Sequence, residues 1–297
     1  MVSRRTLLTA GAATAVGALA GGVAAVEQGL LPGRVELARL LGRCAGDAIL
    51  TGDGPAADLR PASFGSAYRG RDVSWVLALP PGTAPAGLPV VLALHGRGAD
   101  AHTAFTRLGL HHAIARHVAA GGRPFAMATA DGGDTYWHPR VGDDPLGMLI
   151  HELLPRLAEL GLRVDRIGAW GWSMGGFGAL LLARESERDA LAGIRVSAVT
   201  AASPALFHSF ADATPGAFDD PADFTRWGAL LDAPDVSATP LRVTCGDADA
   251  FTDTTREYRA AVHPTPAGGI EPGCHDPGFW HADAPQAAAF LAEHLLR

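Results

Sequence analysis

Short apolar runs alternate with longer segments of helical periodicity from residue 73 to the end of the chain. The continuous apolar runs 90–94 and 124–130 are typical of strands buried on both faces, since a strand with one face in water alternates apolar and polar residues. Helical patterns at 102–119 and 146–160 separate such runs. This alternation predicts an α/β fold with a mostly parallel central sheet and helices on both faces.

The same criteria predict the other elements. We expect further strands and helices, namely strands at 73–79, 166–170, 195–201 and 241–245, and helices after residue 173, at 251–261 and at 284–296. Because ligands of open parallel sheets bind at the carboxyl ends of the strands, chemistry is expected in the loops that follow them.

Composition excludes several classes of function. The formal charge of −7 disfavours binding to nucleic-acid phosphates. All 24 positive side chains are arginines, so no lysine is available as a Schiff base or general base. The three cysteines are too few for a disulfide scaffold and lack CxxC zinc spacing. We therefore expect no metal or organic cofactor and no nucleic-acid partner.

The amino terminus has the pattern of an export signal. Arg4 and Arg5 precede an uncharged apolar stretch that extends to Val26, and the paired arginines resemble a twin-arginine signal, which the export machinery reads. The stretch is about 20 residues long, enough to cross a bilayer if it is retained. Residues 1–29 thus predict a signal or anchor segment, and a protein that is secreted or anchored at the cell envelope.

Beyond this segment, residues 30–70 are rich in glycine, proline and charged residues and are interpreted as a connector that settles on the domain. Residues 71–297 are expected to form one catalytic domain. A stretch rich in proline, aspartate and phenylalanine at about 203–239 is interpreted as an insertion between strands, forming a lid or a pocket wall.

A candidate nucleophile follows one predicted strand. Residues 171–175 read Gly-Trp-Ser-Met-Gly, which fits G-x-S-x-G between a strand and an Ala/Leu-rich helix. The tight turn requires residues without bulky side chains two positions before and after the serine. The pattern predicts that Ser173 projects its hydroxyl from the top of the sheet, where the helix dipole favours developing negative charge.

A serine nucleophile needs a base and an acid that orients the base, and in this fold the three follow in the order Ser, Asp or Glu, His. Two later loops carry suitable residues. Asp247 and Asp249 follow the strand at 241–245, while His275 and His281 lie further on.

Several motifs together resemble the α/β-hydrolase superfamily, in particular the putative-esterase group that includes esterase D-like enzymes and the mycolyltransferase antigens. The resemblance extends from about residue 75 to 296. Its motifs are Leu94-His95-Gly96-Arg97-Gly98, Asp131-Gly132-Gly133, Gly171 to Gly176, Gly246-x-x-Asp249-x-Phe251, and Gly273-x-His275 with Trp280.

This resemblance implies that Asp249 is the acid and His275 the base, with Asp247 and His281 as the alternatives. The oxyanion of the tetrahedral intermediate needs two hydrogen-bond donors. The first is expected to be the backbone N–H of Met174, and the resemblance implies that of Arg97 as the second. Gly96 and Gly98 are alternatives to Arg97, and His95 is interpreted as a residue that braces this loop.

The loop after the strand at 124–130 offers side chains for a substrate. Tyr136, Trp137 and Arg140 are candidates for lining an acyl or alcohol site, and packing of the loop onto the domain is the alternative. Among the cysteines, a Cys245–Cys274 bridge would fix the spacing of the acid and base loops, and pairing of Cys44 with either is the alternative.

These features predict an exported serine carboxylic-ester hydrolase that acts on a small-molecule or lipid ester through a Ser-His-Asp triad and an acyl-enzyme. Two alternatives remain at this point. One is an acyltransferase of the mycolyltransferase type, in which another hydroxyl compound replaces water. The other is a non-catalytic exported binding protein on the same scaffold.

Overall fold

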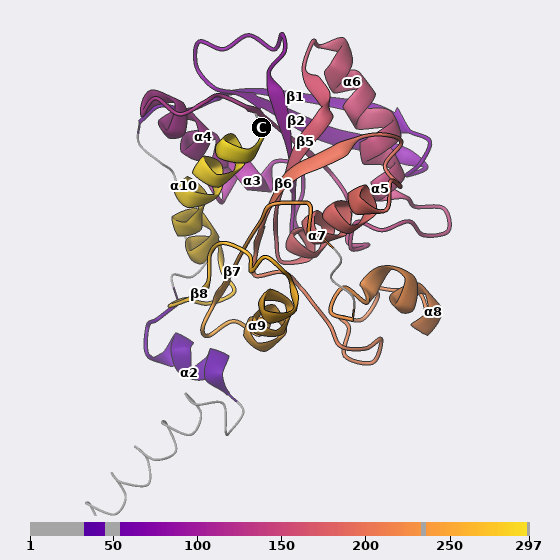
Figure 1. Ribbon diagram of the computed structural model, residues 1–297, viewed down its shortest axis with the longest axis vertical. Coiled ribbons are helices and arrows are strands. Elements are labelled where there is room, and N and C mark those ends of the chain that lie inside the picture. Colours follow the sequence, from indigo (N-terminus) through magenta and orange to yellow (C-terminus); the bar gives the residue numbers. More distant parts are fainter. Residues whose placement is uncertain (1–32, 45–53, 233–235, 296–297) are drawn as a thin grey trace, which may run out of the picture.

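The computed structural model describes residues 33–44, 54–232 and 236–295 (Figure 1). The predicted signal or anchor segment at 1–29 lies outside these residues. Within the described part of the chain, no helix combines the length and the apolar character needed to cross a membrane.

One eight-stranded sheet forms the centre of the molecule, with the strand order β1-β2-β4-β3-β5-β6-β7-β8. β2 pairs antiparallel with β1 and β4, and every other neighbouring pair is parallel. The strands are β1 (Asp58–Ser66), β2 (Arg71–Leu79), β3 (Pro89–Leu94), β4 (Ala126–Ala130), β5 (Arg163–Trp172), β6 (Arg195–Ala202), β7 (Leu241–Gly246) and β8 (Ile270–Glu271). The predicted mostly parallel sheet is thus confirmed.

Helices cover both faces of this sheet (Figure 1). They are α2 (Arg34–Leu40), α3 (Thr103–Thr106), α4 (Leu110–Ala119), α5 (Pro145–Met148), the π-helix η1 (Leu149–Leu153), α6 (Leu154–Glu159), α7 (Met174–Glu187), α8 (Pro221–Asp223), the π-helix η2 (Phe224–Gly228), α9 (Thr252–Ala261) and α10 (Pro277–His294).

The central strand β3 explains why its run of residues is uniformly apolar. Leu92 and Leu94 point into the core beneath α5, α6 and α7, while Val91 and Ala93 point into the core beneath α3, α4 and α10. Successive side chains of a strand face opposite sides, so burial of both sides excludes polar residues.

The sheet begins earlier than the sequence indicated. β1 lies within residues 30–70, which were expected to be a connector, so the sheet starts at Asp58. The strand escapes detection because most of its residues are exposed and it carries no apolar alternation. It is held at the edge of the sheet by backbone pairing with β2.

The last helix also begins earlier than expected, at Pro277 rather than at residue 284. The Asp276 carboxylate accepts a hydrogen bond from the backbone N–H of Phe279 at 2.9 Å and so caps the helix. Pro277 occupies the first helical position, where its missing N–H costs nothing. The aromatic and glycine residues of this first turn hid the helical pattern.

Candidate active site

Ser173 lies at the turn between β5 and α7, with a backbone φ of 56° and ψ of −122°. A side chain at Gly171 would place its Cβ 1.9 Å from the carbonyl oxygen of Gly175, and a Cβ on Gly175 would lie 1.9 Å from that of Leu94. Both positions therefore require glycine. Met174 is the first residue of α7, so its backbone N–H has no acceptor within the helix.

Three residues from distant parts of the chain meet at this turn. The Ser173 hydroxyl donates to Nε2 of His275 at 2.8 Å, and Nδ1–H of His275 donates to Oδ2 of Asp249 at 2.8 Å. Asp249 follows β7 and His275 follows β8, which are neighbours in the sheet. The side chain of Asp249 is fully buried and that of His275 is 27% exposed. The arrangement is a continuous chain of hydrogen bonds from Asp249 to Ser173, with a partly exposed imidazole at its centre.

The alternative acid and base have other partners. The carboxylate of Asp247 accepts the backbone N–H of Gly273 at 3.1 Å. Nδ1–H of His281 donates to the carbonyl of Leu108 at 2.8 Å, on the side of the sheet where α4 and α10 pack. Neither residue belongs to the chain of hydrogen bonds that reaches Ser173.

Local hydrogen bonds hold the Asp249 carboxylate in place. Its Oδ1 accepts the N–H of Phe251 at 2.8 Å, which leaves Oδ2 for His275. The hydroxyl of Thr252 donates to the carbonyls of Gly246 and Asp249 at 2.6 and 2.7 Å and closes the turn. The two carboxylate oxygens therefore have separate, fixed partners.

Two aromatic side chains enclose the imidazole of His275. The ring of Phe251 lies 5.4 Å away between centroids, and Trp280 meets the imidazole edge to face at 5.0 Å. Trp280 is fixed by a hydrogen bond from Nε1 to the hydroxyl of Ser203 at 3.1 Å. The residues from the loop of Asp249 and from α10 thus fix the plane of the base.

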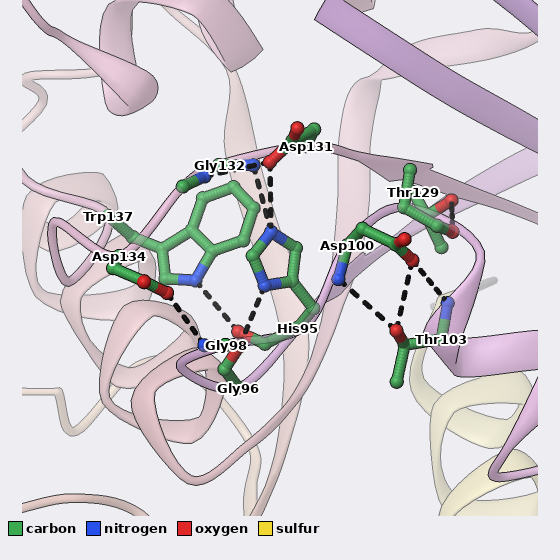
Figure 2. A network of polar contacts seen from close by, with 12 residues as sticks. His95, Gly96, Gly98, Asp100, Thr103, Thr129, Asp131, Gly132, Asp134 and Trp137 are labelled. Carbon is green, nitrogen blue, oxygen red and sulfur yellow. Dashed lines mark hydrogen bonds and ion pairs between the residues drawn. The ribbon is translucent and has the colours of Figure 1, made fainter.

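His95 braces the loop after β3 (Figure 2). Its Nε2 accepts the backbone N–H of Gly132 at 2.9 Å, so Nδ1 carries the proton and donates to the carbonyl of Gly96 at 2.8 Å. The indole N–H of Trp137 donates to the carbonyl of His95 at 3.2 Å. The imidazole is buried and fully used, so it serves the loop rather than a second catalytic base.

The same loop approaches the nucleophile. A Cβ on Gly96 would lie 3.4 Å from the Cβ of Ser173, so a side chain here would contact Ser173. The N–H of Gly98 donates to the Asp134 carboxylate at 2.6 Å and is therefore already used (Figure 2). The backbone N–H groups of Arg97 and Gly96 therefore remain as candidates for the second oxyanion donor, in addition to that of Met174.

Arg69, in a part of the chain that was expected to be a connector, supports the loop after β4. Its Nη1 donates to the carbonyl of Asp131 at 2.5 Å, and its guanidinium also pairs with Asp143. Asp131 directly precedes Gly132, whose N–H binds His95. A buried arginine in the turn between β1 and β2 carries no sequence motif, so sequence reasoning missed it.

The three side chains proposed for substrate binding have other roles in the structure. Tyr136 and Trp137 are 2% and 1% exposed. The hydroxyl of Tyr136 donates to Thr214 at 2.9 Å, and Nη1 of Arg140 donates to the carbonyl of Gly216 at 2.8 Å. These contacts favour the alternative in which the loop packs onto the domain and onto the insertion.

The cysteines pair differently from the first expectation. Cys44 and Cys274 form the disulfide, and Cys245 is a buried thiol, so a Cys245–Cys274 bridge is wrong. Cys245 lies within β7, and burial raises the pKa of its thiol to about 12. The thiol therefore stays protonated and is no rival nucleophile.

Comparison with known proteins decides the family. A family model described as "Putative esterase" matches residues 66–257. The chain belongs to the putative esterase family. This confirms the resemblance drawn from the sequence motifs, and family membership supports a serine ester hydrolase.

The chain is also similar in fold to several solved structures of esterases. A ferulic acid esterase is 20% identical with a TM-score of 0.67, covering 82% of this chain and 99% of that one. An S-formylglutathione hydrolase from Agrobacterium tumefaciens is 15% identical with a TM-score of 0.64, covering 83% and 99%. An arylesterase is 14% identical with a TM-score of 0.63, covering 88% and 91%. The α/β-hydrolase fold of the esterase is thereby confirmed, while comparison with curated proteins gave no match.

Proposed function

We propose that this esterase is an exported serine carboxylic-ester hydrolase in which Ser173 is the nucleophile, His275 the base and Asp249 the group that orients the base. The observation that carries the proposal is the pair of 2.8 Å hydrogen bonds that His275 makes, one to each of the other two residues. The substrate is a small-molecule or lipid ester.

The first half of the reaction forms an acyl-enzyme. Oγ of Ser173 attacks the ester carbonyl carbon while its proton moves to Nε2 of His275. The negative carbonyl oxygen is stabilised by the backbone N–H groups of Met174 and Arg97. When the intermediate collapses, the bond to the alcohol oxygen breaks and His275 returns the proton to that oxygen, which leaves as the alcohol.

The second half releases the acid. Water takes the place of the alcohol and gives a proton to Nε2 of His275 as its oxygen attacks the acyl carbon. Collapse then breaks the bond to Oγ of Ser173, which recovers its proton from the imidazole. Asp249 holds the imidazole tautomer and stabilises the imidazolium in both halves.

The arginine pair at the amino terminus and the disulfide both support export. Disulfides persist in oxidising compartments such as the bacterial periplasm and the cell surface, and are rare in the reducing cytosol. Cys44–Cys274 suits such a setting. Replacing Arg4 and Arg5 by lysine should retain the full-length precursor inside the cell, and normal export of that variant would exclude the twin-arginine route.

A fluorophosphonate probe tests the chemistry directly. It should label the wild type, whereas Ser173→Ala should lose both labelling and hydrolysis of a chromogenic ester. The matched control is Ser63→Ala, since Ser63 is exposed on the edge strand β1, and this variant should leave both unchanged. A wild type that the probe does not label would support the non-catalytic binding protein. Product analysis with an added sugar acceptor separates hydrolysis from acyl transfer.

A further inference from the structure

The amino-terminal helix α2 packs against the two loops that carry Asp249 and His275. Ala38 of α2 forms a small buried cluster with Ala248 and Cys274, separate from the two main cores of the sheet. Ala248 directly precedes Asp249, and Cys274 directly precedes His275. A segment more than 200 residues earlier in the chain therefore contacts the immediate neighbours of both the acid and the base.

A covalent bond fixes this contact. Cys44, four residues after the end of α2, is bonded to Cys274 with 5.3 Å between the two Cα atoms. Figure 1 shows α2 at the end of the sheet where β8 lies, beyond the loops that follow β7 and β8. The bridge therefore ties the residue next to the base to the segment that follows α2.

The acid and base loops are also joined to each other. The N–H of Asp247 donates to the carbonyl of Glu271 at 2.7 Å, and that of Ala248 donates to the carbonyl of Gly273 at 2.9 Å. These bonds couple the two loops, so a displacement at Cys274 is transmitted to both. The coupled loops also contact Ala38 of α2 and Cys44.

We propose that α2, fixed by the Cys44–Cys274 disulfide, is a positioning element for the Asp249–His275 pair, so that ester hydrolysis depends on the oxidation state of this bridge. The inference rests on the proposed function, because it concerns the pair assigned there as acid and base.

Physical reasoning supports the dependence on the bridge. α2 has only seven residues, and a helix this short is marginal without tertiary contacts. Its buried contact with the loops rests on the small side chain of Ala38, which offers little apolar area. Without the bridge, α2 has little to hold it on the loops, and a misplacement of about 1 Å at a catalytic group can cost about 10²-fold in rate.

Dithiothreitol reduces the disulfide by thiol–disulfide exchange. One dithiothreitol molecule gives two electrons and two protons to the Cys44–Cys274 bond, which becomes two thiols, while dithiothreitol closes to its cyclic disulfide. Cys245 is already a thiol and does not take part.

The test compares the wild type with a C44A/C274A double variant, each with and without dithiothreitol. We expect the reductant to lower kcat of the wild type about tenfold with little change in KM, and to have no effect on the variant, whose kcat is already low. The acid limb of the kcat/KM profile should shift in both reduced wild type and variant, because the environment of His275 changes. A thiol count in denaturant with and without reductant verifies the state of the bridge.

A second pair of variants separates positioning from folding. Ala38→Glu keeps both cysteines but forces α2 away from Ala248, and should lower kcat in the same way. Arg39→Glu, at an exposed position of the same helix, is the matched control and should keep the wild-type kcat. Circular dichroism verifies that each variant is folded.

The outcomes distinguish this inference from the proposed function. If the oxidised wild type is neither labelled by a fluorophosphonate nor able to hydrolyse an ester, the proposed function fails. If the wild type is active and the C44A/C274A and Ala38→Glu variants match its kcat and pH profile, only the positioning role of α2 is overturned.

Discussion

The Oδ2 atom of Asp249 lies 2.8 Å from Nδ1 of His275, whereas the nearby carboxylate of Asp247 binds the backbone N–H of Gly273. Asp249→Asn should therefore lower kcat by about 10⁴-fold, because the amide favours the wrong imidazole tautomer. Steady-state kinetics with a chromogenic ester measures the loss.

Asp247→Asn is the matched control for this prediction. The amide oxygen of asparagine can still accept the N–H of Gly273, so kcat should stay close to the wild type. A larger loss in Asp247→Asn than in Asp249→Asn would reverse the assignment of the acid.

Gly175 cannot carry a side chain, because its Cβ would lie 1.9 Å from the carbonyl oxygen of Leu94. Gly175→Ala should lower the free energy of unfolding by about 3 kcal/mol or more, since one of two backbone segments has to move. Gly269→Ala places its Cβ in open space and should be tolerated. Urea denaturation compares the two variants, and equal midpoints would contradict the tight turn at Ser173.

Arg242 of β7 and Asp283 of α10 form a buried ion pair with two contacts of 2.7 Å, their side chains 8% and 4% exposed. Asp283→Ala should lower the free energy of unfolding by about 3–5 kcal/mol, because it leaves a buried guanidinium unpaired.

The exposed pair of Asp253 and Arg256 provides the comparison for this ion pair. Asp253→Ala should cost less than about 1 kcal/mol, because water screens the two charges. Chemical denaturation of both variants measures the difference, and a loss of similar size in the two would exclude a special role for burial.

His111 introduces a dependence of stability on pH. Burial, aided by His112 and Arg116, lowers the pKa of its imidazole to about 4, and its Nδ1 has no hydrogen-bond partner among the described residues. Between pH 6.5 and about 4 the unfolded chain binds a proton at His111 that the folded chain does not. The folded state therefore loses stability as the pH falls through this window.

Replacing this imidazole should flatten the pH dependence. The free energy of unfolding of His111→Gln, measured in urea at pH 7 and pH 5, should fall less on acidification than that of the wild type. His102→Gln removes an imidazole that is exposed to solvent and should keep the wild-type slope. An unchanged slope in His111→Gln would mean that other groups cause the acid sensitivity.

Much of the fold was predictable because its signals are local. The apolar run of β3 is buried on both faces, and Gly171 is required by its contact with Gly175 within one turn. Both features can therefore be recognised from a short stretch of consecutive residues. β1 was missed because an exposed edge strand is stabilised by backbone pairing, which places few demands on side chains.

Some features of the candidate active site were likewise predictable from the sequence, and others were not. The sequence by itself determined the nucleophile candidate, the order of the other two candidates and the loop that His95 braces, because each lies in a short motif tied to a strand end. Only the tertiary structure brought Asp249 rather than Asp247 into hydrogen-bond contact with His275, paired Cys274 with Cys44 rather than Cys245, and placed Trp137 in the core. These choices depend on which distant segments lie within a few ångströms of each other, and local residue patterns carry no such distances.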